Sequence, residues 1–355
     1  MRSCDAEYSF FAIFKRCLSQ QSEIFMSVRD ARLDNIKGGL ILLVIFGHLI
    51  EPLVDMMPAL NRIYNFIYLF HIPAFVLVSG YVSHPNKEIR YSALLKSLVV
   101  PFIVFSIIYE TSDFIALGEV SGYLKVLSPN WILWFLFSLI IWRVFAPLFL
   151  KIRFNLLLLL ALSSSISLIE IDGYVFSIFR TVVFFPFYML GVLLSRYKDT
   201  FLHYQLKPSL SIFSLVILGG IFFLNLPFDR LMLYGVAPFS AFGYSNEYGV
   251  IQRLCYYPVS ILAIFSFGVL VSKLHLLNKI GSNSLYVYLL HGLIVKYLLW
   301  PYMTADDWSV TGVVLLALSL TIILAAILSS TAITRLTSML FQAFQRLILK
   351  NRQLA

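Results

Sequence analysis

The segment NIKGGLILLVIFGHLIE, residues 35–51, is an apolar run with a lysine near its start and a histidine and a glutamate near its end. Glu51 follows His48 at i+3, so the two side chains share one face of a helix. A carboxylate there accepts the proton of Nδ1 and leaves Nε2 as a base, the orienting role of the acid in a Ser-His-Asp triad. Lys37 precedes His48 by about 16 Å of helix. An anionic ligand bound at Lys37 would therefore bring its reactive end to His48.

Each of these residues also has a structural interpretation. His48 would then hydrogen-bond a neighbouring helix, Glu51 would mark the end of its helix at the lipid headgroups, and Lys37 would extend its ammonium to the same kind of interface as an anchor. The sequence alone leaves both interpretations open.

Two more histidines, His71 and His291, lie inside apolar runs. At about 1.5 Å per residue, His48, His71 and His291 lie about 12, 10 and 14 Å from the outer ends of their helices. Ionisable groups within membrane spans are costly and are functional candidates. The common depth favours a shared polar cavity over three separate interhelical hydrogen bonds.

The elements that position these residues are expected to be transmembrane helices. The chain has 355 residues, of which 60% are hydrophobic and 13% charged, with a mean hydropathy of +0.86. A soluble protein would carry about 25% charged residues. Because lipid offers the backbone no hydrogen-bond partner, each run of about 20 apolar residues should be a helix. We predict an all-α, polytopic integral membrane protein with about ten spans: 38–56, 64–83, 93–117, 131–150, 154–171, 178–196, 208–226, 254–273, 283–300 and 309–334.

The distribution of basic residues predicts that both termini are cytoplasmic. Of the 27 lysines and arginines, all but six then fall on the inner side; the exceptions are Arg62, Lys125, Arg180, Arg230, Arg253 and Lys296. The net charge of +9 thus reflects membrane topology and gives no evidence for nucleic acid as a partner. The three cysteines form no disulfide framework and no Cys/His metal-binding spacing, so no metal site is expected.

We divide the chain into a cytoplasmic N-terminal segment (1–31), a membrane domain (32–340) and a basic cytoplasmic tail (341–355). The first residues are either an interfacial amphipathic segment or the result of an over-long start, with Met26 as the alternative initiator.

Four motifs follow one another along the chain: "NIKGGLILLVIFGH" at 35–48, "FHIPAFVLVSGY" at 70–81, "NWILWFL" at 130–136 and "IGSNSLYVYLLH" at 280–291. Together they resemble the acyltransferase family 3 of integral membrane proteins, in particular its fucose-4-O-acetylase-like and O-antigen O-acetyltransferase branch. The resemblance runs from about Arg32 to the last span. Many relatives have arginine where this chain has Lys37, which keeps the charge but lacks the bidentate geometry of a guanidinium.

This resemblance implies a bacterial inner-membrane enzyme that takes an acetyl group from cytoplasmic acetyl-CoA. It implies a cell-surface glycan or a lipid-linked oligosaccharide as the acceptor, at or beyond the outer face of the membrane, with membrane lipids as the surroundings. Lys37 and His48 are then the expected functional pair. The resemblance specifies acetyl only by analogy, and succinyl is an alternative.

Direct transfer is the mechanism that these residues favour, with His48 as general base, Glu51 as its orienting acid and Lys37 as the ligand of the CoA phosphates. Donors for the developing oxyanion are expected among a set of polar residues: His71, Asn283, Ser284, Tyr286 and His291. In a covalent alternative Ser79 is acylated, although Ser-Gly pairs in spans more often serve close helix packing. An acyl group on His48 itself is a further variant.

The acceptor is expected to enter past Trp131 and Trp134 and past the aromatic segment 227–257, which includes Arg253. These aromatic residues also suit an interfacial belt. We expect Arg180 to pair structurally with Glu110 and Asp113. Two other functions fit a ten-helix protein with a polar cavity, namely a lipid-linked glycan flippase or exporter and a polymerase-like membrane protein.

Overall fold

The helix that carries Lys37 and His48 is α2 (Ala31–Ile50) in the computed structural model of this chain. The structure describes residues 30–83, 91–197, 207–303 and 308–348. The predictions for the segment 1–31, for a start at Met26 and for the last residues of the tail lie outside the described residues. Residues 32–355 form one compact unit, which is described here. Asp34 in the first turn of α2 complements the positive end of the helix dipole.

The described residues contain helices and no strand, which confirms the all-α prediction for this part of the chain. The longer helices that follow α2 are α3 (Pro58–Tyr81), α5 (Val100–Leu117), α7 (Trp134–Phe149), α8 (Asn155–Ser165), α9 (Ile178–Leu194), α11 (Pro208–Leu224), α13 (Asn246–Val271), α15 (Ser284–Ile294), α16 (Val310–Leu328) and α17 (Thr331–Ile348). Short helices and single turns join or extend them: η1 (Glu51–Leu53), α4 (Tyr91–Leu94), η2 (Leu95–Val99), α6 (Gly122–Lys125), η3 (Trp131–Leu133), η4 (Ile166–Leu168), η5 (Val175–Ser177), η6 (Ser195–Tyr197), α12 (Arg230–Tyr234), η7 (Phe239–Phe242), η8 (His275–Leu277), α14 (Asn278–Ser282), η9 (Val295–Leu299) and η10 (Trp300–Tyr302).

Seven helical segments of the described chain are long and apolar enough to cross a membrane, judged by length and composition. They correspond to seven of the ten predicted spans. The other three predicted spans are also helical, but two of them are short (Asn155–Leu168 and Pro208–Leu224). The third, 283–300, is divided into α15, a π-helical turn and a 3₁₀ turn. The number of spans and the orientation of the termini stay predictions.

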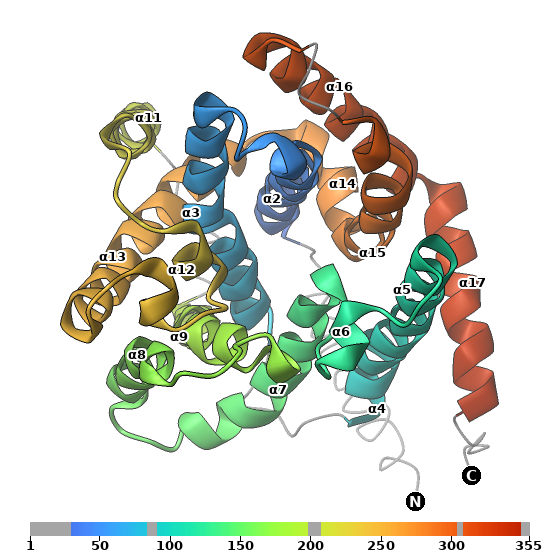
Figure 1. The fold of residues 1–355 in the computed structure, drawn as a ribbon, viewed down its shortest axis with the longest axis horizontal. Helices are drawn as coiled ribbons and strands as arrows, with labels where there is room; N and C mark the ends of the chain where they lie inside the picture. The colour runs from blue at the N-terminus through green and yellow to red at the C-terminus, as the bar shows by residue number, and fades with distance from the viewer. Residues whose placement is uncertain (1–29, 84–90, 198–206, 304–307, 349–355) are drawn as a thin grey trace, which may run out of the picture. The chain divides into compact units, whose positions relative to one another are not determined.

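Two boundaries differ from the sequence prediction in ways that matter for the site. Helix α13 begins at Asn246, so Arg253 lies inside a helix and not in an outer loop. The last predicted span ends at Leu328, and an additional amphipathic helix, α17, follows from Thr331. Helices α16 and α17 follow each other in Figure 1, where α17 also runs beside α5. The rings of Phe341 in α17 and Phe105 in α5 are 6.1 Å apart.

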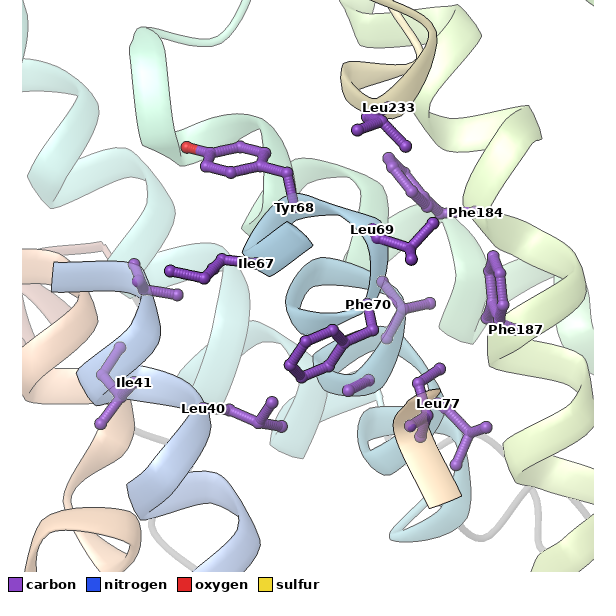
Figure 2. Close-up of a cluster of buried hydrophobic side chains, with 14 of the residues drawn as sticks. Leu40, Ile41, Ile67, Tyr68, Leu69, Phe70, Leu77, Phe184, Phe187 and Leu233 are labelled. Atoms are coloured by element: carbon purple, nitrogen blue, oxygen red, sulfur yellow. The ribbon is translucent and has the colours of Figure 1, made fainter. Parts of the chain in front are cut away.

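The centre of the packing is α3, which lies against α9 (Figure 1). Figure 2 shows Leu69 and Leu77 of α3 facing Phe184 and Phe187 of α9, with Leu233 of α12 above them. The helix backbones approach closely because each carries a glycine at the crossing. A Cβ on Gly80 would fall on the carbonyl oxygen of Tyr188, and a Cβ on Gly191 would fall on that of Leu77. Small residues allow this kind of contact between membrane helices, where packing rather than water exclusion drives association.

Candidate active site

A cavity of about 390 Å³ lies beside α2 and follows that helix from Lys37 past His48 to Glu51. Between Lys37 and Glu51 the helix rises about 21 Å, at 1.5 Å per residue. We name the two ends of the cavity the Lys37 end and the Glu51 end. Helices α3, α7 and α15 contribute most of the remaining wall, and α9 contributes Arg180.

His48 and Glu51 form the contact that their spacing predicts. The His48 Nδ1 and the Glu51 Oε2 are 2.8 Å apart. An ionised carboxylate can accept hydrogen bonds but cannot donate them. This contact therefore places the imidazole proton on Nδ1 and leaves Nε2 unprotonated in the neutral ring. Both side chains line the cavity and are only partly exposed, at 12% and 27%.

The turn that carries His48 is held by a residue from the far end of the chain. In a continuing helix the carbonyl oxygen of His48 would accept from the amide of residue 52, but Pro52 has no N–H. The indole Nε1 of Trp300 donates to this oxygen instead, at 2.8 Å. The C-terminal turn of α2 is therefore fixed by η10.

His71 and His291 are buried and each is bonded to its own helix. The Nδ1 of His71 donates to the carbonyl of Ile67 at 2.8 Å, and that of His291 donates to Val287 at 3.0 Å. These bonds leave each Nε2 as an acceptor in the neutral ring, so neither neutral ring fits the role of an oxyanion donor that the sequence analysis considered. His71 lines the cavity. His291 lies behind its wall, with its ring stacked 5.6 Å from that of His48.

The Lys37 end combines one charged group with small and apolar side chains. Lys37 forms an ion pair with Asp34 at 2.6 Å, and Asp34 is almost fully buried. Ser79 and Ser284 line the wall at this end, together with apolar residues that include Leu98 and Leu285. Among the described residues, no hydrogen bond joins Ser79 to a histidine that could activate it.

Aromatic side chains dominate the Glu51 end. The ring of Trp131 lies 4.7 Å from that of His48 and 5.0 Å from that of Trp300. Tyr123 and Tyr234 also line this end, and burial raises the pKa of both hydroxyls. Both therefore stay protonated and can donate hydrogen bonds.

Besides His291, three candidate residues from the sequence lie outside the cavity wall: Tyr286, whose ring stacks on that of Phe341, and the pair Asn283 and Arg253. Asn283 donates to the carbonyls of Lys279 and Ser329, so it joins α14 to the end of α16. Arg253 is fully buried and donates to the carbonyl of Met232 at 2.8 Å, which holds α12 against α13. The structure gives both residues a packing role.

The predicted pairing of Arg180 with Glu110 and Asp113 is wrong. Asp113 binds Lys296 at 2.6 Å and accepts from Tyr297, while Glu110 accepts from Ser121 and from Asn130. These partners lie up to 184 residues apart in sequence, so no local pattern could identify them. Arg180 instead lines the cavity.

Tyr68, Tyr288 and Trp300 are among the wall residues that sequence reasoning missed. A signal for two of them exists, because each tyrosine precedes a buried histidine by three residues (Tyr68 before His71, Tyr288 before His291) and so shares its helix face. Figure 2 shows Tyr68 pointing away from Phe184 and Phe187, on the other side of α3.

Comparison with known proteins gives two matches. The family model described as "Acyltransferase domain" matches residues 30–330, which include the whole cavity wall. The Nodulation protein NolL of Sinorhizobium fredii (strain NBRC 101917 / NGR234) is 27% identical over 188 residues, which are 47% of this chain and 49% of that protein. The chain thus spans about half the length of this curated relative. No solved structure matches the chain.

Proposed function

The chain belongs to the acyltransferase family, and on this premise we propose that it is a membrane-bound O-acyltransferase that moves an acetyl group from cytoplasmic acetyl-CoA to a sugar hydroxyl of a cell-surface glycan. The observation that supports this proposal best is the single cavity that contains Lys37, His48 and Glu51 along its length. A thioester arriving at one end and an alcohol arriving at the other would meet beside the imidazole. The predicted orientation makes the Lys37 end cytoplasmic and the Glu51 end external.

In the proposed reaction, the sugar hydroxyl attacks the thioester carbonyl while the Nε2 of His48 takes its proton. Glu51 holds the other ring nitrogen and stabilises the imidazolium that forms. The tetrahedral intermediate then breaks its C–S bond, and the proton passes from His48 to the departing sulfur. The products are the O-acetyl sugar and CoA thiol, and His48 returns to its neutral form.

Lys37 would hold the donor at the cytoplasmic mouth. Its ion pair with Asp34 fixes the ammonium at the start of α2, where phosphates of CoA would add further contacts to the same cation. The apolar wall formed by residues such as Leu98 and Leu285 suits the uncharged arm of the thioester. About 16 Å of helix separates Lys37 from His48, a distance that an extended pantetheine arm covers.

Direct transfer is favoured over an acyl-serine. Ser79 lines the cavity, but the only base that the structure equips with an orienting carboxylate, among the described histidines, is His48. A serine nucleophile needs an adjacent base to lose its proton at neutral pH.

The test is acetylation of the surface glycan in cells that lack the native gene and express His48→Ala at the normal protein level. General-base catalysis contributes about 100- to 10,000-fold, so the acetyl groups should disappear from the mass spectrum of the glycan. His275→Ala is the matched control, because His275 is exposed and lies in η8 outside the cavity wall. Full acetylation by His48→Ala would refute the mechanism, and loss of polymer instead of acetyl groups would identify a flippase or polymerase.

A further inference from the structure

Arg180 is a cation that lines the wall of the cavity at its Glu51 end. It lies in the first turn of α9 and is only partly exposed. Its Cζ lies 4.9 Å from the centroid of the Trp134 ring and 5.1 Å from that of Tyr174. Both rings belong to the cavity wall as well. The faces of these rings attract the guanidinium, but they carry no negative charge to neutralise it and no oxygen to accept its N–H groups.

No carboxylate forms an ion pair with Arg180 in the part of the chain that the structure describes. Its Nε is also buried without a hydrogen-bond partner. The other cation at this end, Lys296, is already paired with Asp113. Charged groups removed from water are normally paired. Arg253 also lacks a carboxylate, but it is sealed inside the packing, whereas Arg180 opens into a cavity where a ligand can reach it.

The backbone around Arg180 adopts conformations that non-glycine residues rarely use. Phe176 and Ser177, directly before α9, have φ values of 49° and 50°. The amide of Phe176 donates to the carbonyl of Leu127, which has a φ of 53° itself. Such strained conformations persist only where the surrounding structure fixes them, often at functional sites.

The side chain that follows Arg180 locks this turn in place. The Thr181 hydroxyl donates to the carbonyl of Ser177 at 2.9 Å and bonds Ser138 of α7 at 2.7 Å. The Nε1 of Trp142 donates to the Thr181 carbonyl at 2.7 Å. The first turn of α9 is thereby held against α7, so the guanidinium has a defined place beside Trp134.

We propose that Arg180 binds a negatively charged group of the acceptor, a carboxylate or a phosphate oxyanion next to the sugar that is acylated. This inference rests on the proposed function and names the chemistry of its acceptor. A guanidinium binds a planar carboxylate or a phosphate through two parallel hydrogen bonds. Arg180 lies at the Glu51 end, remote from Lys37, so the anion belongs to the acceptor and not to CoA. Neutral rings on both sides of the cation leave its charge available until the acceptor arrives.

The experiment uses the purified full-length chain in detergent, acetyl-CoA labelled in the acetyl group, and the glycan isolated from a strain that lacks this gene. The glycan is supplied in three forms: native, with its carboxyl groups chemically reduced to alcohols, and with its phosphates removed by hydrofluoric acid. The KM per repeat unit and the kcat are measured for each form. Arg180→Gln and Arg180→Lys are compared with the natural chain, and Arg62→Gln serves as the matched control, since Arg62 is exposed and does not line this cavity.

We expect one of the two treatments to raise the KM of the natural chain about tenfold or more, the scale of a lost hydrogen bond to a charged group. The treatment that does so identifies the source of the anion. Arg180→Gln should raise the KM for the native glycan by a similar factor with a smaller change in kcat, and should no longer distinguish native from treated glycan. The KM of Arg180→Lys for the native glycan should lie between those of the natural chain and of Arg180→Gln.

Equal KM values for all three glycan forms with the natural chain would overturn the inference and leave the proposed function intact. A fall in kcat at unchanged KM for Arg180→Gln would also overturn it, because Arg180 would then stabilise the transition state. If the natural chain acetylates no form of the glycan, the proposed function itself fails, and the inference with it.

Discussion

At the scale of single residues, the partner of Nδ1 distinguishes His48 from the two buried histidines, His71 and His291. His71 and His291 use Nδ1 to bond a carbonyl of their own helix, whereas His48 uses it to bond a carboxylate. A carbonyl fixes the tautomer of the ring but stabilises its charged form only weakly. A carboxylate does both, which is why the proposed mechanism assigns to His48, among these three histidines, the uptake and return of the proton.

The replacement Glu51→Gln separates these two effects. The amide oxygen can still accept from Nδ1, but it cannot balance the charge of an imidazolium. We expect kcat to fall about 10- to 100-fold, the scale of a hydrogen bond to a charged group, while the KM values for acetyl-CoA and for the glycan stay close to those of the natural chain. Steady-state kinetics on the purified protein measures this, and an unchanged kcat would show that Glu51 only marks the end of the helix.

At the scale of elements, the turn η3 that leads into α7 has a strained backbone and depends on a polar network. Trp131 has a φ of 34°, and Asn130 before it donates to Asp113 at 2.6 Å and to Glu110 at 3.2 Å. This network ties η3 to α5 and sets Trp131 against His48. Asn130 therefore positions Trp131, whose ring packs against the imidazole of His48.

We expect Asn130→Ala to lower kcat about tenfold or more, because a small misplacement of a group next to the reacting atoms is costly. The same variant should shift the fluorescence emission of the protein, since Trp131 would move relative to its neighbours. Asn65→Ala is the control, because Asn65 bonds Asn61 on its own helix and does not line the cavity. An Asn130→Ala protein with normal kcat and normal emission would contradict this account.

The crossing of α3 and α9 gives a prediction about stability. Gly80→Ala places a methyl group on a backbone carbonyl of α9, and overpacking of this kind costs about 1–3 kcal/mol. The thermal midpoint of the purified protein in detergent should fall. Gly219→Ala in α11 is the matched control, since nothing lies within 4 Å of its added Cβ. Equal midpoints for the two variants would refute the close approach.

At the scale of the whole molecule, the proposed reaction requires two separate aqueous entrances to the cavity, one at each end. In a chain whose native cysteines have been replaced, a single cysteine is introduced at Ser284 near the Lys37 end or at Tyr174 near the Glu51 end. The predicted orientation then requires that a membrane-impermeant maleimide labels Tyr174→Cys in intact cells and Ser284→Cys only in inside-out vesicles. The reverse pattern would invert the topology, and the cysteine-free chain controls for background labelling.

The sequence predicted what depends on local order and missed what depends on packing. Apolar runs predicted helices because lipid leaves the backbone no alternative, and the i+3 spacing predicted the contact between His48 and Glu51. The bond between Asp113 and Lys296, the place of Arg180 and the burial of Arg253 depend on which helices lie side by side. A single sequence holds no record of those neighbours. The extra helix α17 was missed because polar residues separate its apolar residues along the sequence, so they form no continuous apolar run.

The proline after the turn that carries His48 has a consequence for how this protein can be divided. Because Pro52 deprives the His48 carbonyl of its helical donor, an indole 252 positions later supplies the missing N–H. A fragment that stops short of η10 would retain His48 and Glu51, the proposed proton-transfer pair, but it would lack the indole that anchors the carbonyl of His48. If the proposed mechanism holds, α2 becomes active only when the C-terminal quarter of the polypeptide has been inserted beside it. Co-expressed fragments split before Trp300 should then regain activity only where they reassemble.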